Sequence, residues 1–109
     1  MEIRLLRAFL TVAELRHFGR AADALALSQP ALSKQIVALE ESVGARLFER
    51  GRHGAELTSF GAAFLADAQS LVRDADAVLA RAREASRQIA LALADFCAAI
   101  DRGVPAAAS

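Results

Sequence analysis

Residues 27–36 read LSQPALSKQI and carry the signals of a helix start. Ser28 is typical of a helix N-cap, because its hydroxyl can accept a hydrogen bond from a free backbone N–H. Pro30 suits the first helical turn, where a missing N–H costs nothing. The helical spacing of apolar residues then continues to about Ser42, and Gly44 supplies a C-terminal stop. These signals predict a helix from Pro30 to about Ser42.

The predicted helix has two unlike faces. Its apolar side chains share one arc of the helical wheel and are expected to face a core: Leu32, Ile36, Leu39 and Val43. The opposite face begins with small, polar and basic groups: Pro30, Ser33 and Lys34. Gln29 and Ser33 can hydrogen-bond base edges in a DNA major groove, and Lys34 can reach guanine or a phosphate. Phosphate would repel Glu41, so only the first two turns are expected to enter the groove. An ordinary solvated helix carries the same residue types, so this face needs support from elsewhere.

Two further helices are expected before residue 27. Residues 2–15 form an amphipathic pattern, which we expect Gly19 to end. Residues 20–25 are rich in alanine and predict about two helical turns. Two short helices joined by a tight turn, with a third helix before them, make a helix-turn-helix arrangement.

The support for DNA binding comes from residues 46–58. Residues 46–50 and 55–58 read as two short strands around a loop bounded by Gly51 and Gly54. The polar groups of this hairpin can reach an adjacent minor groove: Arg50, Arg52 and His53. Alone it could be a solvated hairpin. A wing at this distance from a recognition helix favours DNA binding.

A long helix is expected to begin at residue 59, with either Thr58 or Ser59 as its N-cap. Its apolar residues alternate in steps of four and three, as in a coiled coil: Phe64, Ala68, Leu71, Ala75, Val78, Ala82, Ala85 and Ile89. Leu65, Val72 and Leu79 widen that stripe. We expect the winged domain to cover only its first two turns, through Phe60 and Phe64. A second copy is expected to cover the rest, with these dimerisation residues: Phe64, Ala68, Leu71, Val72, Ala75, Val78, Leu79 and Ala82.

Residues 89–94 fit either a helix or a strand. The helical spacing of Leu93, Phe96 and Ile100 favours a helix that ends near Arg102. The expected organisation is therefore a winged helix-turn-helix domain over residues 1–58, a long linker and dimerisation helix over 59–102, in which a break near residue 89 stays open, and a flexible tail over 103–109.

The composition limits the other classes of function. Thirteen basic and thirteen acidic residues cancel, so the net charge gives no support to nucleic-acid binding and the argument rests on the motif. The single cysteine, Cys97, excludes an internal disulfide and a cysteine-cluster zinc site, and its apolar neighbours predict a buried thiol. His17 and His53 have no partners at catalytic or metal-binding spacing, so no enzyme, metal or cofactor is expected. No long apolar segment or signal sequence is apparent, which predicts a cytoplasmic protein with no membrane partner.

Several stretches together resemble the N-terminal domain of LysR-type bacterial transcription regulators. These are FGRAA at 18–22, LSQPALSKQI at 27–36, LEESVG at 39–44, LFER at 47–50, and LT at 57–58 with Gly61. The resemblance covers about residues 2–88. It implies a mainly α, winged helix-turn-helix fold, antiparallel pairing of the long helix, and DNA contacts from these residues: Gln29, Pro30, Ser33, Lys34 and Arg50 to His53. His53 stands where many members carry arginine, and the family's effector-binding domain has no counterpart within these 109 residues.

Two functions follow. The leading interpretation is a sequence-specific DNA-binding regulator of transcription that binds two half-sites as a homodimer, with higher oligomers left open and no small-molecule effector inside this chain. The alternative is a helix-mediated oligomerisation module that modulates full-length regulators.

Overall fold

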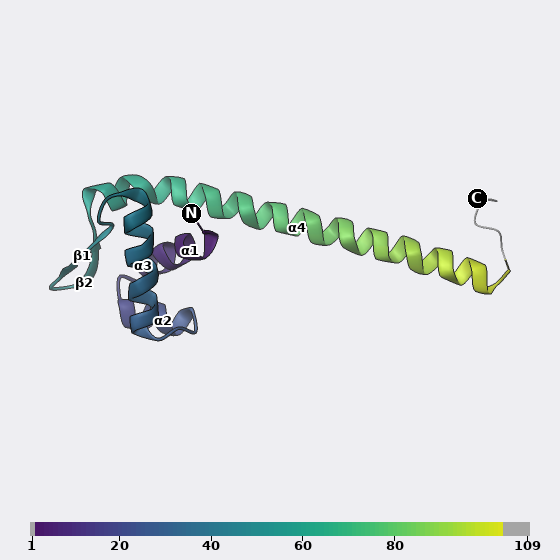
Figure 1. Ribbon diagram of the computed structural model, residues 1–109, viewed down its shortest axis with the longest axis horizontal. Coiled ribbons are helices and arrows are strands. Elements are labelled where there is room, and N and C mark those ends of the chain that lie inside the picture. Colours follow the sequence, from purple (N-terminus) through teal and green to yellow (C-terminus); the bar gives the residue numbers. More distant parts are fainter. Residues whose placement is uncertain (1, 104–109) are drawn as a thin grey trace. The chain divides into compact units, whose positions relative to one another are not determined.

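The computed structural model describes residues 2–103 (Figure 1). Within them the elements are, in chain order, α1 (Ile3–Leu15), α2 (Phe18–Ala24), α3 (Gln29–Val43), β1 (Phe48–Gly51), β2 (Gly54–Leu57) and α4 (Ser59–Asp101). The chain divides into two compact units, one up to Ala75 and one from Asp76 onward. The predicted fold class, mainly α with three helices, a two-stranded wing and a long following helix, is confirmed.

The turn between α1 and α2 differs from the expected one. The chain leaves α1 at Arg16, which adopts a left-handed conformation with φ 56° and donates its N–H to the carbonyl of Val12. His17 then caps α2, because its Nδ1 accepts a hydrogen bond from the N–H of Arg20 at 3.0 Å. The expectation that Gly19 ends the first helix is wrong, since Gly19 lies inside α2.

The local signals around α3 are confirmed. The hydroxyl of Ser28 accepts a hydrogen bond from the N–H of Ala31 at 3.2 Å. Gly44 ends the helix in the left-handed region, with φ 80°, where a glycine meets no steric penalty. Three of the four residues predicted to face the core are buried, namely Leu32, Ile36 and Leu39, and Val43 is partly buried.

Thr58, which lies between the hairpin and α4, makes hydrogen bonds to both the start of α4 and the segment before β1. β1 and β2 pair antiparallel with Phe48 opposite Leu57 and Gly51 opposite Gly54, so Arg52 and His53 form the turn. Thr58 is the residue that caps α4, because its Oγ1 accepts a hydrogen bond from the N–H of Gly61 at 2.9 Å. The same hydroxyl donates to the carbonyl of Arg46 at 2.6 Å.

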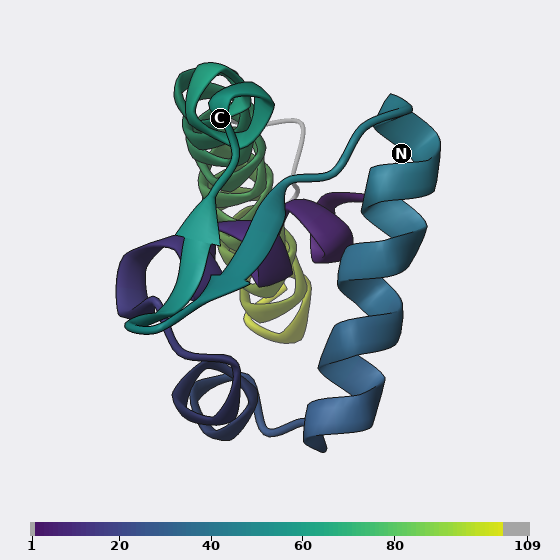
Figure 2. The same cartoon turned by 90° about the vertical axis from the view of Figure 1, so that its left-hand side faces the viewer.

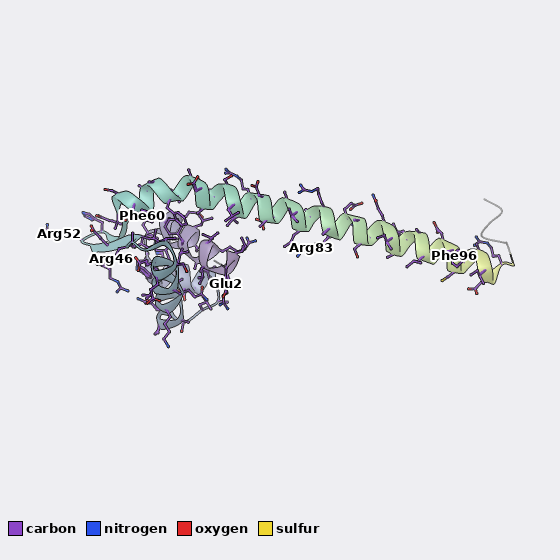
Figure 3. All side chains as sticks on the ribbon, turned by 45° about the horizontal axis from the view of Figure 1, so that its top comes forward. Glu2, Arg46, Arg52, Phe60, Arg83 and Phe96 are labelled. Atoms are coloured by element: carbon purple, nitrogen blue, oxygen red, sulfur yellow. The ribbon has the colours of Figure 1, made fainter. Side chains whose placement is uncertain are left out.

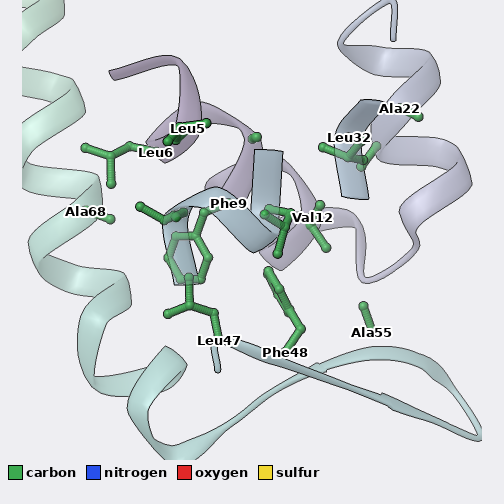
Figure 4. Packing of buried hydrophobic residues seen from close by; sticks show 14 of the residues in the cluster. Leu5, Leu6, Phe9, Val12, Ala22, Leu32, Leu47, Phe48, Ala55 and Ala68 are labelled. Atoms are coloured by element: carbon green, nitrogen blue, oxygen red, sulfur yellow. The ribbon is translucent and has the colours of Figure 1, made fainter. Parts of the chain in front are cut away.

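Aromatic rings hold the core of the first unit together. Phe9 of α1 is fully buried, and its ring centroid lies 5.4 Å from that of Phe48 and 5.4 Å from that of Phe64. Leu6, Val12 and Leu47 pack around it (Figure 4). Phe9 therefore joins α1, the hairpin and α4 through contacts within the first unit.

The first unit covers more of α4 than the sequence suggested. Ala68 and Val72 are only 1% and 8% exposed and belong to the core, and Ala68 points towards Leu6 (Figure 4). Phe64 is half-buried against the same core, whereas Phe60 remains 40% exposed. The expectation that the domain covers only the first two turns of α4 is wrong, because Ala68 and Val72, which lie beyond those turns, are buried in the core of the first unit.

The second unit, as far as residue 103, is the remainder of α4. Residues 89–94 are helical, which settles the choice between helix and strand, and the helix ends at Asp101. Arg83 and Phe96 project from this segment (Figure 3). Cys97 is exposed, so the prediction of a buried thiol is wrong. Apolar neighbours along one helix do not bury a side chain, because burial requires contacts from another segment. Of the expected tail at 103–109, residues 104–109 lie outside the described residues.

Candidate nucleic-acid interface

The N-terminal turns of α3 present the residues predicted to read DNA. Gln29, Pro30 and Lys34 are exposed, and Ser33 is half-buried. The helix begins just before these side chains, so its free backbone N–H groups and the positive end of its dipole lie beside them. Farther along the helix Val37 is half exposed. This end of α3 combines hydrogen-bonding groups, one cation and a favourable dipole.

The hairpin carries the predicted wing residues, and Arg50, Arg52 and His53 are all exposed. Figure 2 looks onto the hairpin and shows α2 and α3 framing it. Arg50 is held in place, because its guanidinium carbon lies 4.8 Å from the centroid of the Phe18 ring. That ring meets Phe48 edge-on at 5.9 Å. Arg52 and His53 occupy the two-residue turn and project from it without such support in the described contacts.

Two depressions connect α3 with the hairpin. One has a volume of about 120 Å³ and is bordered by Ser33 and Val37 on one side and by Arg50 on the other. The second, of about 220 Å³, is bordered by Gln29 and Arg50. The structure thus brings Gln29, Ser33 and Arg50 to one connected surface. Pro30, Lys34, Arg52 and His53 lie outside the linings of these two depressions.

Arg46 belongs to this surface, although the sequence analysis did not select it. It is exposed and borders the first depression together with Ser33 and Arg50. Its carbonyl is fixed by the hydroxyl of Thr58, so its backbone cannot drift away from the site. The available signal was its place in the predicted strand 46–50, where residues of even separation point to the same side, although β1 itself begins only at Phe48.

One acidic residue beside this surface, Glu40, accepts a hydrogen bond from the backbone. Glu40 borders the first depression, and its Oε2 accepts a hydrogen bond from the N–H of Leu47 at 2.7 Å. A backbone N–H bound to the carboxylate offsets part of its negative charge. The cations Arg46 and Arg50 therefore remain the groups available to an anionic partner in this depression.

The predicted dimerisation residues separate into two sets. Leu71, Val78, Leu79 and Ala82 are exposed. Ala75 and Phe64 are partly covered, and Ala68 and Val72 are buried in the core of their own chain. The expectation that Ala68 and Val72 are left for a partner is corrected, because both are already buried in the core of their own chain.

A metal cluster and a membrane-spanning helix are both absent from the part of the chain that the structure describes. Over residues 2–103, no three His, Cys, Asp or Glu side chains come together as a metal site would require. None of the described helices has both the length and the apolar character needed to cross a bilayer.

Comparison with known proteins gives the family. Residues 3–62 match the family described as bacterial regulatory helix-turn-helix protein, lysR family. The HTH-type transcriptional regulator BudR of Klebsiella aerogenes is 53% identical over 87 residues, which are 80% of this chain and 61% of that protein. The regulator TfdT of Cupriavidus pinatubonensis is 53% identical over 72 residues, which are 66% of this chain and 32% of that protein. The chain thus spans less than two thirds of the length of these relatives.

Solved structures agree with this assignment. The DNA-binding domain of CbnR in complex with DNA is 42% identical, with a TM-score of 0.72, over 79% of this chain and 99% of that chain. The DNA-binding domain of BenM bound to the catB site 1 DNA is 38% identical, with a TM-score of 0.74, over 79% of this chain and 97% of that chain. With its helix-turn-helix, its hairpin and its matching residues 3–62, this chain belongs to the LysR family of bacterial regulatory helix-turn-helix proteins.

Proposed function

We propose that this chain binds double-stranded DNA at a specific sequence and regulates transcription, with α3 as the recognition helix and the hairpin as the wing. The observation that carries the proposal is the joint placement of Gln29, Ser33 and Arg50 around one surface at the capped N-terminus of α3. The related CbnR and BenM domains have been solved with DNA, which supports the same partner here.

In this proposal the first two turns of α3 enter the major groove. Gln29 and Ser33 hydrogen-bond base edges, Lys34 binds guanine acceptors or a phosphate, and Pro30 packs against a base edge. The helix N-terminus adds its dipole to the attraction for phosphate. Glu41 stays outside the groove because it lies farther along the helix, where its charge would meet phosphate repulsion.

The wing provides charge next to the recognition helix. Arg50, Arg52 and His53 lie near the adjacent minor groove or its phosphates, and Arg46 adds a fourth group on the α3 side. Such contacts fix the position of the domain on the duplex and contribute affinity on every sequence. Arg50 differs from the others because the Phe18 ring restrains it before DNA arrives.

The functional unit is proposed to be a homodimer that pairs through α4 and holds two winged domains on two half-sites. The exposed members of the predicted dimerisation residues are the ones available for this contact: Leu71, Val78, Leu79 and Ala82. No catalytic step belongs to this function, and a regulator that acts on bacterial DNA would work in the cytoplasm.

The exposed apolar side chains of α4 also favour a second candidate, a module that oligomerises through this helix with full-length regulators and needs no DNA contact of its own. In such a module, substitutions on α3 would leave its activity unchanged. The two candidates therefore differ in what Lys34 and Ser33 do.

The deciding experiment is selection of duplexes from a random pool, followed by fluorescence anisotropy on the selected duplex. Lys34→Ala and Ser33→Ala should each weaken binding by about 5- to 150-fold, the effect of losing one base contact. Arg83→Ala, which removes an exposed cation from the second unit, serves as the matched control and should change affinity little. If the α3 variants bind as tightly as Arg83→Ala, α3 does not recognise DNA.

A further inference from the structure

One apolar side chain stands on the face of α3 that is proposed to meet DNA. Val37 lies four residues after Ser33 and three after Lys34, so the helical period puts it on their face. It is 50% exposed. A single exposed apolar residue is ordinary on a protein surface. Val37 is set apart by the surface that surrounds it.

Val37 borders the depression of about 120 Å³ between α3 and the hairpin. Four of the residues that line this depression are apolar: Phe18, Ile36, Val37 and Phe48. Ile36 and Phe48 are each only 3% exposed, and Phe18 is half-buried, so Val37 is the most exposed of the four. A ligand that enters the depression would therefore remove more of Val37 from water than of its apolar neighbours.

The same depression has two cations in its lining, Arg46 and Arg50. The carboxylate of Glu40 also borders it, but accepts a hydrogen bond from the N–H of Leu47 at 2.7 Å. The surface thus combines an apolar contact on α3 with positive charge opposite. A DNA strand offers the matching combination where a base carries a methyl group and phosphates lie on either side of it.

The chemistry of the base edges selects thymine for the contact with Val37. In the major groove thymine presents its C5 methyl group, whereas guanine, adenine and cytosine present only hydrogen-bonding groups. Valine can neither donate nor accept a hydrogen bond. Against a polar edge it would displace water without replacing the lost hydrogen bonds, which costs free energy. Against the methyl group both apolar surfaces leave water together, which is favourable.

We propose that Val37 reads a thymine in each half-site by packing against its C5 methyl group. The proposal rests on the proposed function and adds a base preference to it. Val37 lies about 6 Å beyond Ser33 along the helix axis, at 1.5 Å per residue. A base-pair step is about 3.4 Å, so the thymine should lie within about two base pairs of the base that Ser33 contacts. Glu41, one turn farther, ends this face with a negative charge.

Deletion of the thymine methyl group from the DNA tests the contact directly. Deoxyuridine pairs like thymidine and lacks only that methyl group. Each dT in one half-site of the selected duplex is replaced in turn, and the affinity of the full 109-residue chain is measured by fluorescence anisotropy. One replacement should weaken binding of the wild type about fourfold, the effect of no longer burying one methyl-sized group.

The variants assign that methyl group to Val37. In Val37→Ala the same replacement should leave the affinity almost unchanged, because the side-chain methyl groups that pack against it are gone. Val37→Ile keeps a branched apolar side chain and should retain the response. Ser42→Ala, which changes an exposed residue on a different face of α3, is the control and should respond as the wild type does. A wild type that is insensitive to every replacement, or a Val37→Ala variant with the full response, would overturn the proposal.

Repeating the random-pool selection gives an independent readout. The duplexes selected by Val37→Ala should lose the preference for thymine at one position in each half-site and keep their other preferences. Retention of thymine at every position would show that Val37 does not read it.

Failure of this contact and failure of the proposed function give different results. A chain that is weakened by Lys34→Ala but is indifferent to deoxyuridine keeps its proposed function and loses the thymine contact. A chain that selects no duplex at all loses both.

Discussion

The backbone N–H of Ala55 donates a hydrogen bond to the carbonyl oxygen of Arg16, with 3.1 Å between the two atoms. This contact joins β2 of the hairpin to the turn between α1 and α2. Arg16 has the left-handed backbone conformation that ends α1, so its carbonyl points to the hairpin only because the helix breaks there. The position of the wing is therefore set by a turn almost forty residues earlier in the chain.

Gly54 is expected to be indispensable for this contact. Its φ is +100°, and a Cβ on it would lie 2.4 Å from the same carbonyl oxygen of Arg16. Gly54→Ala should destabilise the fold by about 1–3 kcal/mol through backbone strain alone, with the clash in addition. Gly44→Ala is the matched control, because its φ is +80° but nothing lies within 4 Å of the added Cβ. Thermal unfolding should show the larger loss for Gly54→Ala, and equal losses would contradict a role for the clash.

Glu40 is expected to stabilise the entry to the hairpin. Its carboxylate accepts a hydrogen bond at 2.7 Å from the N–H of Leu47, a fully buried residue. Glu40→Ala leaves that N–H without its charged partner and should cost about 1–3 kcal/mol of unfolding free energy. The neighbouring Glu41 is exposed, so Glu41→Ala should cost almost nothing. Urea denaturation of the two variants gives the comparison, and the idea fails if they unfold at the same midpoint.

Thr58 is expected to act through its hydroxyl rather than through its methyl group. The hydroxyl accepts from the N–H of Gly61 and donates to the carbonyl of Arg46, so it caps α4 and fixes the loop before β1. Thr58→Ala should lower the unfolding free energy by about 0.5–2 kcal/mol, the usual cost of losing an N-cap. Thr58→Ser retains the hydroxyl and should restore most of that stability. A serine variant as unstable as the alanine variant would show that the methyl packing matters instead.

The wing arginines are expected to contact DNA phosphates or to be attracted by the negative electrostatic potential of the minor groove. Each lost phosphate contact should reduce the slope of log K against log salt by about 0.9, so the Arg50→Ala, Arg52→Ala double variant should lose up to about two units. Because Arg50 lies over the Phe18 ring, Arg50→Lys should weaken binding more than Arg52→Lys, which only exchanges one exposed cation for another. Anisotropy over a salt series measures both effects. An unchanged slope in the double variant would remove the wing from the DNA.

Much of the fold follows from signals that act within a few residues. Ser28 and Gly44 bound α3 as predicted, because capping depends on hydroxyl chemistry and on glycine's tolerance of positive φ. The hairpin was predictable because glycines flank its two-residue turn. The face of α3 that we propose reads DNA could be told from the core face in the sequence, since the 3.6-residue period separates the two faces before any tertiary contact forms.

The features that the sequence did not reveal depend on contacts between distant segments. Arg16 takes a positive φ without being glycine, and its carbonyl accepts the hydrogen bond from Ala55 of the hairpin. Arg46 joins the candidate site because Thr58 anchors its backbone from the far side of the hairpin.

The kind and order of the elements, and the apolar stripe of α4, could be predicted from the amino-acid sequence, because capping, turn chemistry and periodicity are local properties. Which part of that stripe the chain buries within its own core could not be predicted in this way. In the folded chain Ala68 and Val72 pack into the core, whereas Cys97 stays exposed. An apolar stripe identifies the side chains that favour burial, but the segments that bury them are distant in sequence and meet the stripe only when the chain is folded.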